Sequence, residues 1–262
     1  MSVEESLVLI EAEGAVATLT LNRPAQFNAL SSSMLGALHA ALDSVAAISE
    51  IRVVILAAAG SAFCAGHDLR EMRAHLEKDW LSALFTQCSN VMLAIREMPQ
   101  PVIACVHGVA TAAGCQLVAA CDLAIASRSA TFATSGVKLG LFCSTPAVAV
   151  TRALAAKHAA ELLYTGEFIT AGQAERWGLI NRCVDDAALA EAARLWAHAI
   201  AGKSGAALAS GKALLRLQQS LSLADAYVMA GDNMAQDMQN VDAGMGIDAF
   251  LQKQPMPEWM HR

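Results

Sequence analysis

Two short loops of small residues constrain this chain more than any other feature. One runs Ser61–Leu69 after the apolar segment Arg52–Ala59, and the other runs His107–Gln116 after the apolar segment Val102–Val106. Each has the pattern of a buried strand, a turn of small residues and the beginning of a helix. Small residues allow a ligand close to the backbone, and a helix start offers free N–H groups and a positive dipole end. Two such loops aimed at one point would hold an oxyanion between two N–H donors.

The rest of the pattern indicates strands early in the chain and helices late. Strands are expected at Leu7–Glu11, Ala15–Leu21, Arg52–Ala58, Val102–Val106, Asp122–Ala126 and Ile180–Val184, and the first two should form a β-hairpin. A helix capped by Ser31 or Ser32 is expected between the second and third strands. A longer helix, at about 79–98 and stopped by Pro99 and Pro101, is expected between the third and fourth. After Asp185 the pattern predicts only helices, at about 186–201, 205–219, 223–237 and 242–252.

This order predicts an α/β fold in which strand pairs alternate with helices, followed by an all-helical C-terminal part. The small-residue segment Gly202–Gly205 is the best candidate break, so we expect a core of residues 1–202 and a helical part of residues 203–262. The chain is long enough for a full hydrophobic core. Its 55% hydrophobic content includes only 5% aromatic residues, which indicates many Ala-rich helices suited to close packing between subunits.

Charge and cysteine usage exclude several classes of function. A net charge of −6 without a Lys/Arg cluster argues against nucleic-acid binding. The seven cysteines lie mostly in apolar runs and show no paired metal-ligand spacing, which indicates free thiols in a reducing compartment and no metal. The acidic start shows no signal-peptide pattern, and the uncharged stretch Met98–Cys121 carries Pro, Gly, Gln, His and Thr. We therefore expect a soluble cytoplasmic protein with no membrane partner.

Several motifs in fixed order resemble the crotonase (enoyl-CoA hydratase/isomerase) superfamily along nearly the whole chain. They are Leu21–Pro24 with Asn28–Leu30, Phe63–Leu69, Gly108–Asp122, Tyr164–Gly166 with Ala171–Ala174, Trp177–Ile180, and Ala249–Lys253. Each is weak alone, and their shared order and spacing make the resemblance specific. The segment Gly136–Pro146, paired with the run Thr111–Gln116, is most similar to one subgroup of this superfamily.

The resemblance implies a ββα-repeat spiral core, a homotrimer or dimer of trimers, and an acyl-CoA thioester as ligand, with coenzyme A entering as part of the substrate and no separate cofactor. In the superfamily two backbone N–H groups bind the thioester oxygen, and here they fall on His67 and Ala113. The implied coenzyme A-binding residues are Arg23, Ala65, Gly66, His67, Asp68, Leu69, Arg70, Gly114, Phe250 and Lys253. Arg23 and Lys253 would meet phosphates, or else simply face water.

The chain departs from the superfamily at both catalytic glutamates. Gln116 stands at the first position and Gly136 at the second, and neither side chain can take a proton. Positioned acid–base groups contribute about 10²–10⁴-fold each, so ordinary hydration should be largely lost. Gln116 would either orient water or a carbonyl, or bond within its own helix. Ser144 or Cys143 would be a nucleophile, or only the lead-in to a helix.

Three functions remain open from the sequence. The first is an acyl-CoA enzyme, nominally an enoyl-CoA hydratase or isomerase, that stabilises a thioester enolate; decarboxylation is a related chemistry that needs no base. The second is a non-catalytic acyl-CoA-binding protein. The third is a hydrolase that uses Ser144 or Cys143. For His67 a backbone role is sufficient, with an imidazole role as the alternative, and Asp68 is expected to cap the helix after it.

Overall fold

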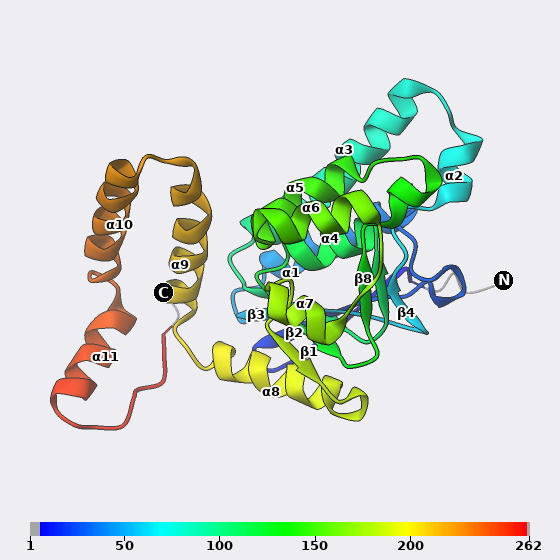
Figure 1. Ribbon diagram of the computed structural model, residues 1–262. Coiled ribbons are helices and arrows are strands. Elements are labelled where there is room, and N and C mark those ends of the chain that lie inside the picture. Colours follow the sequence, from blue (N-terminus) through cyan, green and yellow to red (C-terminus); the bar gives the residue numbers. More distant parts are fainter. Residues whose placement is uncertain (1–5, 261–262) are drawn as a thin grey trace.

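The strands form two sheets, and from β3 to β8 consecutive strands belong alternately to the larger and the smaller sheet (Figure 1). The computed structural model describes residues 6–260. In the order in which they pair, the strands of the larger sheet are β1 (Val8–Glu13), β2 (Val16–Leu21), β3 (Val53–Ala58), β5 (Val102–Val106), β7 (Leu123–Ser127) and β10 (Arg182–Val184). The smaller sheet has β4 (Ala62–Cys64), β6 (Val109–Thr111), β8 (Thr131–Ala133) and β9 (Ile169–Thr170).

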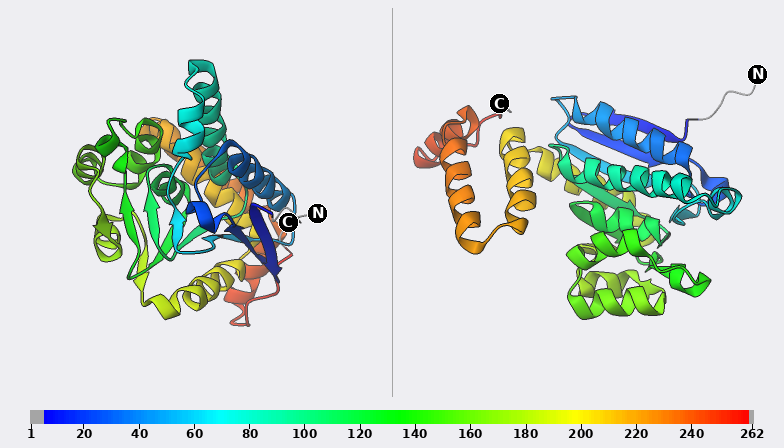
Figure 2. Two further views of the ribbon diagram at one scale, coloured as in Figure 1. Left: turned by 90° about the vertical axis from the view of Figure 1, so that its right-hand side faces the viewer. Right: turned by 90° about the horizontal axis from the view of Figure 1, so that it is seen from above.

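The helices lie on both faces of the larger sheet and beyond its end (Figures 1 and 2). They are α1 (Ser32–Ala46), α2 (Leu69–Ala74), α3 (Lys78–Glu97), α4 (Ala113–Ala120), α5 (Ser144–Ala153), α6 (Ala156–Thr165), α7 (Ala171–Trp177), α8 (Leu189–Ala201), α9 (Gly205–Leu217), α10 (Leu223–Asp237) and α11 (Val241–Leu251). Short 3-10 helices occur at Pro24–Gln26, Ser135–Leu139, Asp186–Ala188 and Gln218–Ser220.

A repeated strand–strand–helix unit builds the body. β3, β5 and β7 enter the larger sheet in parallel, and the strand that follows each of them, β4, β6 or β8, enters the smaller sheet. The expected α/β fold with ββα repeats is therefore confirmed. The short strands of the smaller sheet were not predicted, because two or three residues are too few to show a two-residue period.

The central strands β3, β5 and β7 of the larger sheet are largely buried on both faces, which explains their continuous apolar runs, whereas the edge strand β1 is exposed beyond Val8. In β3, Val54 and Leu56 face the main core under α1, α3 and α4, whereas Val53 and Ile55 face the layer covered by α8. The hairpin of β1 and β2 and all of the expected strands are present, with boundaries shifted by at most a few residues. Ser31 caps α1 as expected, since its Oγ accepts a hydrogen bond from the Met34 N–H.

The last three helices form an arm that extends from the α/β body (Figures 1 and 2). The chain leaves α8 after Ala201 and enters α9 at Gly205, where the break was expected. Lys212 on α9 holds the arm: its Nζ donates to the carbonyls of Ile95 at 2.7 Å and Gln100 at 2.8 Å, and pairs with Asp122 Oδ2 at 2.7 Å. Because α9 is bound to the body in this way, the division into 1–202 and 203–262 stays a prediction.

Candidate active site

The two small-residue loops meet because the strands before them are neighbours. β4 and β6 pair in parallel, with Ala62 opposite Val109, so their carboxyl ends lie at one edge of the smaller sheet. The contact between the loops is close enough to require glycine. A Cβ on Gly114 would lie 2.1 Å from the Cys64 carbonyl oxygen, and one on Gly66 (φ +91°) would lie 3.2 Å from the Ala113 nitrogen. The loops therefore converge, as the sequence predicts.

Two backbone N–H groups at this junction have no acceptor. Leu30 pairs with the chain on either side of His67: the Leu30 N–H donates to the Gly66 carbonyl, and the Leu30 carbonyl accepts from the Asp68 N–H. In such a parallel bridge the N–H of the residue in between, His67, points away from Leu30. Ala113 is the first residue of α4, whose first intrahelical bond is made by Gln116 N–H. Within residues 6–260, neither the His67 nor the Ala113 N–H donates a hydrogen bond.

A strained residue sets the direction in which α4 begins. Ala112 has φ 51° and ψ −118°, in the region that favours glycine, and its N–H donates to the Ala133 carbonyl at 2.9 Å. Such strain costs of the order of 1–3 kcal/mol and persists only where the surroundings enforce it. It turns the positive end of the buried helix α4 toward Gly66. An alanine at position 113 thus presents its N–H as a glycine would.

The His67 imidazole is held in one orientation beside these donors. Its Nδ1 lies 3.3 Å from the Leu30 carbonyl oxygen, and its ring meets the Phe85 ring edge-on at 5.4 Å between centroids. Its Nε2 is buried and has no partner in the described part of the chain. Burial lowers the pKa of His67, although the Leu30 carbonyl and the nearby Glu71 carboxylate act in the opposite direction. The shift favours the neutral form of the ring.

Asp68 caps the next helix, as expected. Its Oδ1 accepts from the N–H groups of Arg70 and Glu71, and its Oδ2 binds Arg23 Nη1 at 2.8 Å. Partial burial raises the pKa of the carboxyl, but the Arg23 and backbone hydrogen bonds outweigh it, and the net shift is downward. Arg23 is thus paired with Asp68 on the rim of the site, and its contact with a phosphate stays a prediction.

Gln116 is buried in the first turn of α4, with 3% of its surface exposed. Its Oε1 has no hydrogen-bond partner within residues 6–260, so the alternative in which the side chain is satisfied within its own helix does not hold for the oxygen. Side chains on a helix tilt toward its N-terminus, which brings the Gln116 amide back toward Ala113. An acceptor without a donor costs about 1–3 kcal/mol, so this oxygen is suited to a ligand.

Position 136 is closed to any side chain. A Cβ on Gly136 would lie 2.5 Å from the Leu141 carbonyl oxygen and 2.8 Å from Cys143 Sγ. Cys143 is buried, and burial raises the pKa of its thiol, although a bond from Gly136 N–H opposes this. Ser144 is exposed and its hydroxyl donates only to the Phe142 carbonyl, at 3.4 Å. Neither residue has the activating base that a nucleophile requires.

The remaining predicted residues fall into two groups. Ala65, Gly66, Leu69, Arg70 and Gly114 surround the junction of the two loops, and Ala65 N–H is fixed by the Phe27 carbonyl at 3.0 Å. Phe250 and Lys253 lie at the end of α11, and α11 lies at the opposite end of the molecule from α2 (Figure 1). A single chain does not bring these two residues to His67.

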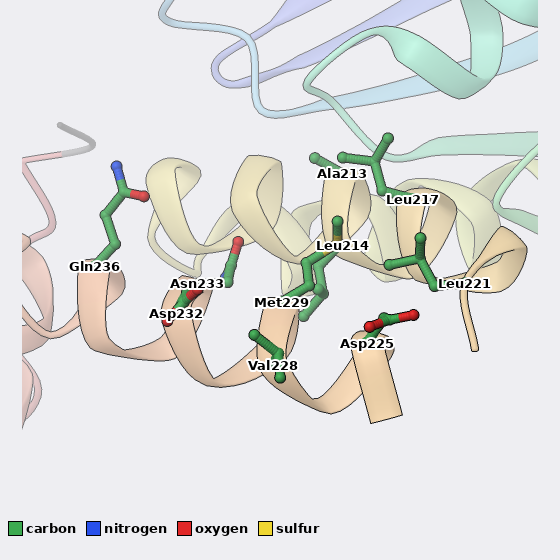
Figure 3. A pocket seen from close by; sticks show the side chains of 10 residues that line it. All are labelled: Ala213, Leu214, Leu217, Leu221, Asp225, Val228, Met229, Asp232, Asn233 and Gln236. Carbon is green, nitrogen blue, oxygen red and sulfur yellow. The ribbon is translucent and has the colours of Figure 1, made fainter. Parts of the chain in front are cut away.

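The arm also carries an open groove. It has a volume of about 520 Å³ and runs between α9 and α10 over Leu214, Leu217 and Val228 (Figure 3). None of the predicted site residues lines it. Asp225, Asp232, Asn233 and Gln236 also line it, all on α10.

Residues that the sequence did not single out support the loops. Asn28, fully buried at φ 54°, donates through Nδ2 to the carbonyls of Ala59 and Ala62 at 2.8 Å and accepts from Arg23 N–H. Glu71 accepts from both the N–H and the hydroxyl of Ser32, which ties α2 to α1. The motif Asn28–Leu30 was the only local signal for the role of Asn28, and no local signal indicated the bonds between Glu71 and Ser32.

Among the described residues, no group of three or more His, Cys, Asp or Glu side chains is placed to bind a metal. None of the helices of residues 6–260 has the length and apolar character that crossing a membrane requires.

Comparison with known proteins shows the family and the fold. The family described as enoyl-CoA hydratase/isomerase matches residues 11–262. The rat mitochondrial protein named enoyl-CoA hydratase domain-containing protein 3 is 42% identical over 98% of this chain and 86% of its own. The crystal structure of an enoyl-CoA hydratase from Mycobacterium smegmatis has a TM-score of 0.95 at 50% identity, covering 97% of this chain and 99% of that one. The human enoyl-CoA hydratase domain-containing protein 3 structure has a TM-score of 0.93 at 40% identity, covering 96% and 99%.

These relatives confirm one prediction and overturn another. The subgroup indicated by Gly136–Pro146 is that of enoyl-CoA hydratase domain-containing protein 3. The predicted cytoplasmic location is wrong, because the rat, mouse and human relatives are all named as mitochondrial proteins. Free thiols indicate a reducing environment, and neither they nor the net charge distinguish one such compartment from another.

Proposed function

This chain belongs to the enoyl-CoA hydratase/isomerase family, and we propose that it binds the carbonyl oxygen of an acyl-CoA thioester between the N–H groups of His67 and Ala113. The observation that carries the proposal is the pair of N–H groups without acceptors where the two loops meet. Donors fixed in advance stabilise the charge of an enolate without reorganising, and each is worth about 2.7–4 kcal/mol of transition-state stabilisation. The reaction proposed is hydration or isomerisation of a 2-enoyl thioester.

The missing carboxylates keep a second function in view, that of an acyl-CoA-binding protein without catalysis. The specific observation in its favour is at Gly136, where the Leu141 carbonyl and Cys143 fill the space that a side chain would need. Decarboxylation needs the same oxyanion site and no base, and so is the enzymatic alternative. A hydrolase that uses Ser144 or Cys143 lacks support, since neither has a base beside it.

We also propose a trimer or a dimer of trimers. The arm exposes many large apolar side chains, among them Leu215, Leu223, Tyr227, Val228, Phe250 and Leu251. Exposed apolar surface of this extent marks an association site. Phe250 and Lys253, which do not reach His67 within one chain, would reach the coenzyme A of a neighbouring subunit.

The first experiment follows the conjugated-thioester absorbance of crotonyl-CoA and, by calorimetry, the binding of butyryl-CoA. The test variant replaces Ala113 by lactic acid, which turns its N–H into an ester oxygen and so removes one donor while keeping the backbone geometry of Ala112. We expect a rate about 10²–10³-fold lower. The matched control is the same replacement at Ala156, at the exposed start of α6, and circular dichroism checks both variants. Binding without turnover would favour the non-catalytic function, and absence of binding would refute both.

A further inference from the structure

The His67 side chain carries the inference that the observations support furthest. The backbone N–H of the same residue is one of the two proposed oxyanion donors. Bond lengths within one histidine therefore keep the imidazole Nε2 within about 6 Å of that N–H. The Leu30 carbonyl can only accept, so the Nδ1 that lies 3.3 Å from it carries the proton. Nε2 then presents a lone pair, and nothing within residues 6–260 donates to it.

A second acceptor belongs to the other loop. Gln116 Oε1 is also buried without a partner among residues 6–260, and Gln116 lies one helical turn after Ala113 on α4. Each of the two loops therefore carries one N–H donor and one side-chain acceptor that are unpaired in the described part of the chain, and together these groups match a ligand that brings both a carbonyl oxygen and two O–H donors. An enoyl thioester together with one water molecule has this composition.

We propose that His67 is the catalytic base of this site, in place of the absent carboxylates, and that Gln116 holds the water that it activates. This inference rests on the proposed function. The water oxygen bonds to Cβ of the enoyl group while Nε2 takes one of its protons. The C=C electron pair moves toward the thioester, and the N–H groups of His67 and Ala113 hold the resulting enolate oxygen. The imidazolium then returns a proton to Cα, so that water is added overall and the imidazole is regenerated.

The surroundings suit the ring to this role. Phe85 on α3 packs edge-on against it, Leu30 fixes its tautomer, and Glu71 on α2 is the charged group that acts on it. Glu71 is itself engaged by Ser32, so the carboxylate stays in place. Nε2 and Oε1 are both buried, so water does not already occupy them as it would an exposed side chain.

Replacing His67 by alanine separates the side chain from the backbone, because His67→Ala keeps the N–H. We expect crotonyl-CoA hydration to fall about 10²–10⁴-fold while the Kd for butyryl-CoA changes less than about threefold. The wild-type kcat/KM should decline as the pH falls through the lowered pKa of His67, and the variant should lose this decline. His75→Ala, an exposed histidine stacked on Trp80 at 4.5 Å, is the matched control and should keep wild-type activity.

Exchange of the Cα protons of butyryl-CoA in D₂O, followed by NMR, provides a readout that does not depend on hydration. Exchange that is present in the wild type and lost in His67→Ala supports the base. Equal hydration or exchange rates in the two proteins refute it and leave the proposed function standing. A wild type that binds butyryl-CoA without hydration or exchange also refutes it, whereas failure to bind butyryl-CoA refutes the proposed function itself.

Discussion

Gly114→Ala should break the junction between the two loops. The added methyl carbon would lie 2.1 Å from the carbonyl oxygen of Cys64, 2.8 Å from the carbonyl carbon of Cys64 and 2.9 Å from the Cys64 Cβ. Restoring an ordinary contact of 3.4 Å from 2.1 Å needs about 1.3 Å of movement between α4 and the loop after β4. Both are buried backbone segments, so the strain cannot be relieved by rotating a side chain.

We expect two effects of different size. Overpacking of this kind costs about 1–3 kcal/mol of unfolding free energy. The displacement also moves the Ala113 N–H relative to the His67 N–H, and an error of about 1 Å at a reacting centre can cost about 10²-fold in rate. The variant should therefore be folded but nearly inactive, with acyl-CoA binding weakened.

Urea denaturation gives the unfolding free energy, and the crotonyl-CoA assay gives the rate. The matched control is Gly36→Ala in α1, where the methyl group would meet only Gln87 Nε2, at 3.5 Å. Alanine in place of a helical glycine gains up to about 1 kcal/mol, so this control should be as stable as the wild type or more so, with unchanged activity. A Gly114→Ala protein with wild-type stability and activity would refute the packing of the loops described above.

Three further outcomes follow from the structure. Asp68→Ala removes a helix cap and should lower the unfolding free energy by about 0.5–2 kcal/mol. Because the pKa of Asp68 is lowered in the folded protein, the difference in unfolding free energy between wild type and variant should be complete above about pH 4. Urea titrations at more acidic pH should show this difference vanish as the carboxyl is protonated. Lys212→Met removes the donor to the Ile95 and Gln100 carbonyls together with the ion pair to Asp122, and should lower the unfolding free energy by about 1–3 kcal/mol, detected as a lower Tm and faster proteolysis between α8 and α9; an unchanged Tm would contradict the anchoring of the arm. Gly136→Glu should have a Tm far below that of the wild type, because position 136 has no space for a side chain. Gln116→Glu should fold, and a gain of crotonyl-CoA hydration in this variant would show that position 116 faces the acyl group.

The elements of this protein were predictable where a long apolar period marks them. The strands of the larger sheet and the helices α1, α3 and α8 to α11 follow from such patterns. The two loops were also predicted, because a strand, a small-residue turn and a helix start are all local signals, whereas the assignment of donors to His67 and Ala113 came from the resemblance and stays a prediction. The pairing of β4 with β6, which brings the two loops together, links residues far apart in the chain and has no local signal.

The surroundings of the donors were less predictable for the same reason. His67 contacts the carbonyl of a residue 37 positions away, and Asp68 binds an arginine 45 positions away. Local sequence indicated that Asp68 would cap a helix, yet it could not reveal the ion pair with Arg23. Nor could it show that Nε2 of His67 lacks a donor, since that depends on every element packed around the ring.

Positions 116 and 136, where the sequence predicts a departure from the family pattern, are not equivalent in the structure. Gln116 is buried and its Oε1 has no partner among residues 6–260, so its side chain leaves an acceptor free for a ligand. At Gly136 the space is occupied by the Leu141 carbonyl and the Cys143 thiol, so recovering a carboxylate there would require rebuilding that segment. The strain at Ala112 costs stability and serves to aim the Ala113 N–H, which both catalysis and binding of a thioester would use. The two functions differ instead in their need for a proton acceptor, so the unpaired Nε2 of His67 is the feature that favours catalysis, and the hydration and exchange rates of His67→Ala decide between them.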